Sequence, residues 1–382
     1  MAANKIIRTA TVAMSLNILL KGQLRYLNQF FDVLAVSGYD ADLETVKNRE
    51  GVSIVSVTMK RSIAPFQDLI SLYRLYKLFK KERPTIVHSI TPKAGLLSMV
   101  AAKYANVPVR IHTFTGLVFP AKKGLFQKLL ILMDKVLCWH ATHIIPEGAG
   151  VKQDLLDYKI TKKPLEVIAN GNVNGIDTTF FNSNTISEQQ QQNLRNELGI
   201  DSSDFVFVFI GRLVADKGIN ELVRAFLSLE IPNCKLLLVG PYETEDPLQP
   251  KTLKAIQQND SILSVGFQHD VRPYLVISDC LVFPSYREGF PNVVMQAGAM
   301  GLPSIVTDIN GSNEIIIEGF NGTIVPSKNV TALLRAMIRI KEDETWRNQL
   351  QSNARSSIIS RYEQELVWEA LLIKYKEFLK VQ

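Results

Sequence analysis

Two loop segments in the second half of the chain carry the residues best suited to chemistry. The first is Gly211-Arg212-Leu213-Val214-Ala215-Asp216-Lys217-Gly218, which follows a continuous apolar run and precedes a helical pattern. Open α/β sheets bind ligands outside the carboxyl ends of their strands, and Gly211 lets the backbone turn there. Arg212 and Lys217 would then stabilise the charge of a departing diphosphate without a metal ion. The alternative is a solvated basic turn.

The second segment, Pro284 to Gln296, again joins an apolar run to the start of a helix. Gly289 frees the backbone, and Pro291 suits the first turn of a helix. Backbone amides at a positive helix end can face a phosphate or sugar hydroxyls. The amides expected to do so are those of Gly289, Phe290 and Asn292.

Two side chains of this segment add hydrogen-bonding capacity. Glu288 lies before the helix, where it can accept hydrogen bonds from a sugar. Gln296 lies about one turn inside the helix and can reach ribose hydroxyls. The alternative is a capped helix with an incidental acid.

The elements that must position these loops alternate between short apolar runs and helical patterns. This alternation predicts an α/β fold with parallel sheets covered by helices. In the first half, strands are expected at 6–12, 31–36, 52–57, 85–89 and 109–113, with a helix at 69–79. In the second half, strands are expected at 205–210, 235–239, 262–265, 280–284, 304–307 and 323–325, with a helix at 219–229. Turn signals between 168 and 183 mark the joint, and 362–379 is expected to be a long amphipathic helix.

Together the two segments resemble the signature of family-4-type retaining glycosyltransferases, which have the GT-B fold. The segments Met300 to Asp308 and Gly319 to Gly322 resemble the same family, and the looser match at 88–116 resembles the acceptor side of capsule and O-antigen enzymes. The resemblance implies two Rossmann-like domains with a donor/acceptor cleft between them. Residues 1–172, with the helix at about 362–382 packing back, would form the acceptor side. Residues 173–361 would bind the nucleotide-sugar donor.

The resemblance also implies roles for individual residues. Arg212 and Lys217 would hold the donor diphosphate, Glu288 would contact the transferred sugar, and the backbone of 289–292 would cradle sugar and phosphate. Two positions depart from the pattern. Gln296 replaces the family's second glutamate, and Thr115 stands where a histidine often precedes glycine. His112 is the other acceptor-side candidate. It lies three residues before Thr115, and on an extended strand this spacing places the two side chains on opposite faces.

Charge differs between the two halves of the chain. Residues 1–185 hold 24 lysines and arginines against 13 aspartates and glutamates, a net charge of +11, whereas the remainder carries −5. Basic residues mix with apolar ones at 61–83 and 121–135. A core-packing helix with a solvated basic end is one interpretation of the first stretch. Attachment to an anionic membrane surface is the other.

Several weaker signals are set aside. Asp40-Ala41-Asp42 matches a short metal-binding signature, but a surface loop is favoured. His140 and His143 have no evident third ligand, so no metal site is expected. Cys138, Cys234 and Cys280 are interpreted as buried thiols of a reducing compartment. The apolar start at 9–20 is interpreted as a strand and helix, not a signal peptide. Nucleotide-loop signatures and aromatic-basic runs for nucleic acid are missing from the sequence.

The expected function is hexosyl or N-acetylhexosaminyl transfer from a nucleotide-diphosphate sugar, with UDP favoured. The expected acceptor is a polyprenyl-diphosphate-linked saccharide, at the cytoplasmic face of a membrane, without a cofactor. Two alternatives remain open from the sequence. One is a sugar-nucleotide epimerase on the same fold, and the other is a non-catalytic nucleotide-sugar-binding subunit.

Overall fold

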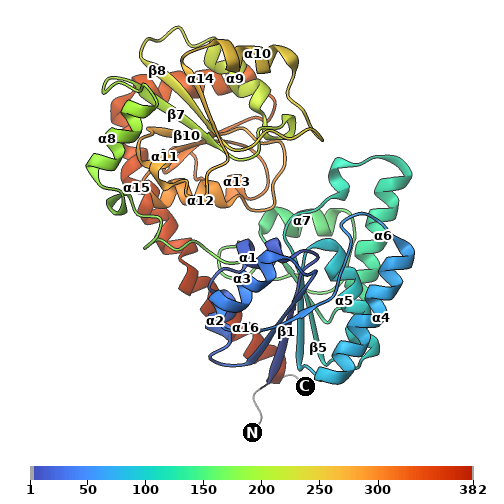
Figure 1. Cartoon of the computed structure of the whole chain (residues 1–382). Coiled ribbons are helices and arrows are strands. Elements are labelled where there is room, and N and C mark those ends of the chain that lie inside the picture. Colours follow the sequence, from blue (N-terminus) through green and yellow to red (C-terminus); the bar gives the residue numbers. More distant parts are fainter. Residues whose placement is uncertain (1–3, 381–382) are drawn as a thin grey trace. The chain divides into compact units, whose positions relative to one another are not determined.

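The computed structural model describes residues 4–380, which divide into two compact units. The first unit runs to Gly175 and resumes at Gln364, and the second runs from Ile176 to Glu363. Over the described range each unit contains one parallel six-stranded sheet (Figure 1). The expected α/β class is therefore confirmed. The boundaries expected from sequence, at 172 and 361, lie near the two points where the chain passes from one unit to the other. The donor and acceptor roles of the units stay predictions.

The sheet of the first unit has the order β3-β2-β1-β4-β5-β6, so the order reverses between β1 and β4. Ile6 of β1 pairs with Val33 on one side and with Ile86 on the other. The strands are β1 (Lys5–Thr9), β2 (Asp32–Ser37), β3 (Ser53–Ser56), β4 (Ile86–Ile90), β5 (Val109–Phe114) and β6 (His143–Pro146). Strand β6 was missed from sequence because its four residues, which begin with a histidine, show no period of their own.

Helices cover both faces of this sheet. One core cluster joins the sheet to α1 (Ala13–Leu19), α2 (Gln23–Leu27), α3 (Ala41–Glu50) and α16 (Gln364–Lys380). The other joins it to α4 (Pro65–Glu82), α5 (Pro92–Tyr104), α6 (Gly124–His140) and α7 (Ala149–Asp157). The short 3-10 helix η1 (Phe119–Ala121) precedes α6. Both faces of the sheet are therefore buried, which explains the continuous apolar strands.

The C-terminal helix α16 packs within the first unit through a buried polar cluster. Tyr375 is fully buried, and its hydroxyl accepts a hydrogen bond from Nη1 of the equally buried Arg8 at 2.9 Å. The same hydroxyl lies 2.5 Å from Nδ1 of His88. Burial, helped by the Arg8 charge, lowers the pKa of His88 well below its usual value, so this imidazole is neutral. The packing therefore ties the end of the chain to β1 and β4.

The sheet of the second unit has the order β12-β11-β10-β7-β8-β9 and reverses between β7 and β10. Every residue of β7 is buried, as a central parallel strand requires. The strands are β7 (Phe205–Ile210), β8 (Cys234–Val239), β9 (Ile262–Gly266), β10 (Cys280–Phe283), β11 (Ser304–Thr307) and β12 (Gly322–Val325). The helical elements are η2 (Ser183–Thr185), α8 (Glu188–Glu197), η3 (Ala215–Lys217), α9 (Ile219–Leu227), α10 (Pro250–Gln258), α11 (Arg272–Val276), α12 (Asn292–Ala299), α13 (Ser312–Ile315), α14 (Val330–Glu342) and α15 (Glu344–Tyr362).

The structure corrects one helix boundary. Tyr362, expected to begin the last helix, instead ends α15, and Glu363 adopts φ −55° and ψ 138° before α16 begins. This extended residue bridges to Ile176, whose amide donates to the carbonyl of Tyr362 at 2.7 Å. A helical pattern that continued through the break hid it from sequence reasoning. Among the described residues, none of the helices has both the length and the apolar character needed to cross a membrane.

Candidate active site

The two motif segments leave neighbouring strands at the point where the strand order of the second unit reverses. The Gly211 segment follows β7, the Pro284 segment follows β10, and these two parallel strands pair directly. A reversal point leaves a crevice at the carboxyl ends of the strands, which is the usual ligand site of such sheets. The fold therefore brings together two segments that lie about seventy residues apart in sequence.

Close backbone contacts hold the two loops together. Gly218 has φ +72°, and a Cβ atom built on it would lie 2.1 Å from the carbonyl oxygen of Pro284. The amide of Tyr286 also donates to the carbonyl of Asp216 at 2.9 Å. On the other side of the first loop, a Cβ on Gly240 would lie 1.8 Å from the Gly211 oxygen. Side chains are excluded at both glycines, so the loops are fixed against each other by their backbones.

Lys217 and Glu288, each singled out from sequence, form an ion pair across this contact. The side chains are 16% and 15% exposed, so the pair is largely screened from water but still partly accessible. Ser285 also donates its hydroxyl to Oε1 of Glu288 at 2.7 Å. The pair places one cation and one hydrogen-bond acceptor side by side, which suits a ligand that carries both phosphate and hydroxyl groups.

Arg212 has a partner that sequence reasoning missed. Its Nη1 atom lies 2.7 Å from Oε2 of Glu243, in the loop after β8, and its side chain is 54% exposed. The two cations are therefore neutralised by different loops, Arg212 by Glu243 and Lys217 by Glu288. Gly240-Pro241-Tyr242-Glu243 follows a buried strand, and this strand-end position was the signal that could have identified Glu243.

The remaining donor-side candidates lie around the start of α12. Pro291 is the residue before the helix, with φ −74° and ψ 106°, and was expected within the first turn. The backbone of 289–290 packs on Gly311, where a Cβ would lie 2.4 Å from the Gly289 oxygen. Phe290 is buried, and its ring meets Tyr362 edge-on at 5.5 Å, so its side chain serves the core.

Two further donor-side candidates, Asn292 and Gln296, lie on α12 itself and are half-buried. Among the described residues the Gln296 side chain forms no hydrogen bond, so its amide can still turn to a ligand. Asn292 is the first residue of the helix. Both therefore lie beside the loop that carries Glu288.

In the first unit, the two acceptor-side candidates have different surroundings. His112 is 1% exposed, its Nδ1 atom lies 2.9 Å from the Ser89 hydroxyl, and a Cβ on Gly95 would lie 2.4 Å from its ring. Burial lowers its pKa to about 3, so it is neutral and enclosed by the core. This position argues against direct contact with an acceptor. Thr115 follows the end of β5 and is half-buried.

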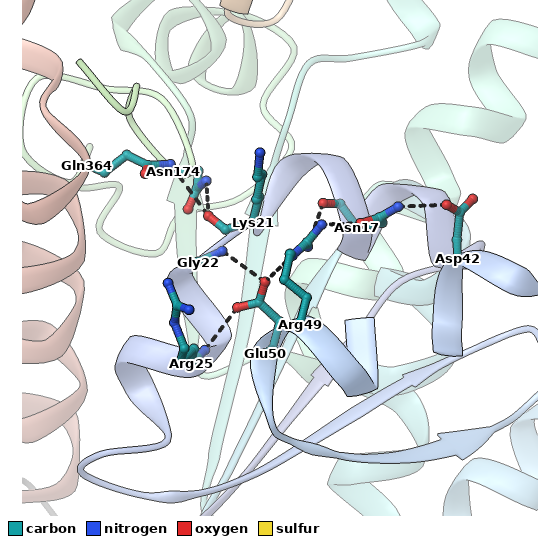
Figure 2. Close-up of polar contacts among 9 residues, drawn as sticks. All are labelled: Asn17, Lys21, Gly22, Arg25, Asp42, Arg49, Glu50, Asn174 and Gln364. Carbon is teal, nitrogen blue, oxygen red and sulfur yellow. Dashed lines mark hydrogen bonds and ion pairs between the residues drawn. The ribbon is translucent and has the colours of Figure 1, made fainter. Parts of the chain in front are cut away.

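The Asp40–Asp42 segment was expected to be a surface loop, but it forms the start of α3, with Asp40 as the N-cap and Asp42 in the first turn. Asp40 caps this helix by accepting a hydrogen bond from the Leu43 amide at 3.2 Å. Figure 2 shows Asp42 bound to the Asn17 side chain, at 2.6 Å, within a polar network that joins α1, α2 and α3. At its centre the buried Glu50 accepts from the amides of Gly22 and Arg25 (Figure 2). Asp40 therefore caps α3, and Asp42 links α3 to α1, so both aspartates are engaged in the local structure.

The other side chains that were set aside also have partners of their own. Nδ1 of His140 lies 2.8 Å from the Val136 carbonyl oxygen, whereas His143 stacks on Phe378 with ring centroids 3.7 Å apart. Within residues 4–380, no three His, Cys, Asp or Glu side chains are grouped as metal ligands. The three cysteines are buried and unpaired, and burial raises the pKa of Cys138 to about 12.

Comparisons with known proteins match both halves of the chain. Residues 20–178 match the model of Glycosyltransferase Family 4, and residues 190–357 match that of Glycosyl transferases group 1. The capsular polysaccharide biosynthesis glycosyltransferase CapM of Staphylococcus aureus is 33% identical and covers 100% of this chain, over 99% of its own length. The UDP-Gal:alpha-D-GlcNAc-diphosphoundecaprenol alpha-1,3-galactosyltransferase of Escherichia coli is 26% identical, covering 88% of this chain and 86% of itself. The structure of Anabaena HepE in complex with UDP and glucose aligns with a TM-score of 0.82 at 17% identity, covering 98% of this chain and 100% of its own.

Proposed function

This chain belongs to the group 1 and family 4 glycosyltransferases, and from that premise we propose that it transfers a sugar from a UDP-sugar to a lipid-linked saccharide. Its fold is GT-B, as the motifs predicted. The donor class is supported by the Escherichia coli relative, whose name specifies a UDP-sugar. That name also specifies a diphosphoundecaprenol-linked acceptor, and the Staphylococcus aureus relative acts in capsular polysaccharide biosynthesis.

The contact between Lys217 and Glu288 carries the proposal. In the proposed complex, Lys217 and Arg212 bind the donor diphosphate, while Glu288 accepts hydrogen bonds from the transferred sugar. In the free protein each of the two cations pairs with a carboxylate. The bound diphosphate would replace these carboxylates as the anionic partner of Lys217 and Arg212. Gln296 would hydrogen-bond the ribose, and the backbone of 289–292 would line the sugar and phosphate.

The proposed reaction needs charge stabilisation at the leaving group. The bond between the anomeric carbon and the diphosphate oxygen breaks, and its electron pair stays with the diphosphate. The acceptor hydroxyl oxygen forms the new bond to the same carbon from the same face, and its proton passes to the departing phosphate oxygen. Lys217 and Arg212 would lower the energy of this anionic oxygen as charge develops there.

Replacing the two cations tests the assignment. Arg212→Ala and Lys217→Ala should each reduce turnover by about 10²–10³, because each removes a donor that stabilises developing charge. Arg224→Ala and Lys251→Ala are matched controls, since both residues are exposed on helices of the same unit. Turnover is measured with a panel of UDP-sugars and a lipid-linked acceptor, and thermal unfolding verifies the fold. Near-normal turnover of both site variants would remove the assignment.

The epimerase and non-catalytic alternatives are less well supported, because the named relatives are transferases. The same assay separates them. A new epimeric sugar nucleotide formed without acceptor would favour an epimerase. Binding of UDP-sugar without any product, across the acceptor panel, would favour a binding subunit.

We further propose that the first unit attaches reversibly to an anionic membrane surface. Exposed apolar side chains line α4 and α6, including Phe66 at 88% and Leu125 at 84% exposure. Lysines and arginines accompany them in the two basic stretches, and each cation near such a surface adds about 1 kcal/mol. Leu69→Ser on α4 should weaken binding to anionic vesicles at low salt, whereas the same substitution at Leu227, which is 48% exposed at the end of α9 in the second unit, should not. Equal binding of both variants, or salt-independent binding, would contradict the proposal.

A further inference from the structure

A cavity of about 690 Å³ lies in the first unit, and nothing in the reaction described above uses it. Thr11 and Thr91, which follow β1 and β4, line it and share a hydrogen bond of 2.8 Å. These are the two strands between which the sheet order reverses, so the cavity lies at the usual ligand site of this sheet. Its volume is within the range of small-molecule sites, about 300–1,000 Å³.

Hydrocarbon side chains form most of the exposed wall of the cavity. Leu96 comes from α5, Phe114 from β5, and Leu130 and Met133 from α6. Sugar hydroxyls against such a wall would lose their hydrogen bonds to water without replacement, which is costly. A hydrocarbon ligand would instead gain by leaving water. The lining therefore selects for a hydrocarbon chain over a saccharide.

The charged groups of the lining are compatible with that choice. Lys93 is paired with Asp68 at 2.8 Å, so its charge is satisfied. Asp134 lines the cavity from α6 and forms no hydrogen bond or ion pair within the described part of the chain. Burial raises the pKa of Asp134 to about 7, so its carboxyl can take up a proton when hydrocarbon excludes water.

The lining of the cavity also includes an exposed basic side chain and exposed apolar ones, which form its rim. Arg61 lines the cavity, is exposed, and has no carboxylate partner among residues 4–380. Lys122 and Lys123 are exposed and lie in sequence between the lining residues Val118 and Phe126. Val118 and Phe126 are themselves 41% and 47% exposed. A ligand with a hydrocarbon chain and an anionic head would match both the wall and the rim.

We propose that this cavity binds the isoprenoid units adjoining the diphosphate of the acceptor, with Arg61 beside that diphosphate. The inference rests on the proposed function, because it assumes a lipid-diphosphate acceptor, and it adds where the lipid is recognised. A hydrocarbon chain held here would fix the saccharide end of the acceptor relative to the carboxyl end of the sheet. Recognition would then depend on lipid type as well as on the sugar.

Binding of farnesyl diphosphate to the full chain tests the inference. Isothermal titration should show binding that weakens about tenfold or more in Leu96→Trp, which fills the cavity, and in Met133→Trp, a second filling variant. Arg61→Gln should weaken binding several-fold and reduce its salt dependence. Leu132→Gln is the control, because Leu132 is 58% exposed on the same helix and is outside the lining. It should leave farnesyl diphosphate binding unchanged. Stabilisation by UDP verifies that each variant is folded.

Three results would overturn the inference. Both tryptophan variants could bind farnesyl diphosphate as tightly as the parent protein. Inorganic diphosphate could bind as well as farnesyl diphosphate, which would leave the hydrocarbon without a role. Lysophosphatidic acid could compete equally, which would make the cavity a general lipid site. If sugar transfer to a lipid-linked acceptor persists in any of these cases, the proposed function still stands; if no UDP-sugar supports transfer, the proposed function fails separately.

Discussion

Gly218→Ala is expected to damage both stability and donor binding, because Gly218 sets the distance between the two motif loops. An alanine there must adopt φ +72°, which costs about 1–2 kcal/mol. Its Cβ would also lie 2.1 Å from the Pro284 carbonyl oxygen, so the loops must separate by about 1 Å or more to reach an ordinary contact. Overpacking of this kind adds about 1–3 kcal/mol. The expected destabilisation is therefore about 2–5 kcal/mol.

The same displacement should reach the Lys217–Glu288 pair, because Lys217 directly precedes Gly218. A shift of about 1 Å in a catalytic constellation costs on the order of 10²-fold in rate. We therefore expect weaker UDP affinity together with a loss of turnover of that order in Gly218→Ala.

Gly199→Ala provides the matched control for Gly218→Ala. Gly199 is in the same unit, has φ +63°, and has nothing within 4 Å of a built Cβ. It should carry the cost of the backbone conformation, about 1–2 kcal/mol, without changing UDP binding. Thermal unfolding and UDP titration of the full chain measure both effects. If the two variants show equal melting temperatures and equal UDP affinity, the loop contact does not constrain the site and the reasoning is refuted.

Three further outcomes are expected. Glu288→Gln should reduce kcat more than Gln296→Glu, which should act mainly on the donor KM because ribose contacts are similar in ground and transition states; equal losses of kcat would contradict these roles. Sugar transfer should survive EDTA, because the cations of the site are placed to bind the diphosphate. If EDTA abolishes transfer and added Mg²⁺ or Mn²⁺ restores it, the prediction of a metal-independent reaction is wrong. The pKa of Asp134 is about 7 in the folded protein, above its ordinary value of 3.8. Between these two pH values the unfolded chain binds fewer protons than the folded protein, so the stability of the fold decreases as the pH rises from 3.8 to about 7. Asp134→Asn should therefore raise the melting temperature more at about pH 8 than at about pH 5, and an equal change at both would argue against a raised pKa.

The sequence by itself determined most of the strands and the candidate loops. Continuous apolar runs such as Phe205 to Ile210 signal strands buried on both faces, and glycine and proline mark the turns that follow them. Burial and backbone preference are local properties, so they leave a period or a residue type that can be recognised. The motif segments after β7 and β10 were therefore found as strand-to-helix loops before any partner was known.

Only the tertiary structure decided which of these residues meet. The ion pair between Lys217 and Glu288 depends on β7 lying beside β10, and the pairing of Arg212 with Glu243 depends on β8 lying on the other side of β7. The enclosure of His112 depends on α5 crossing β5 at Gly95. Strand order and helix packing arise from contacts between residues far apart in the chain, and such contacts leave no periodic signal in a single sequence. The chemistry of the site therefore follows from the strand order, while the residue types that serve it were visible beforehand.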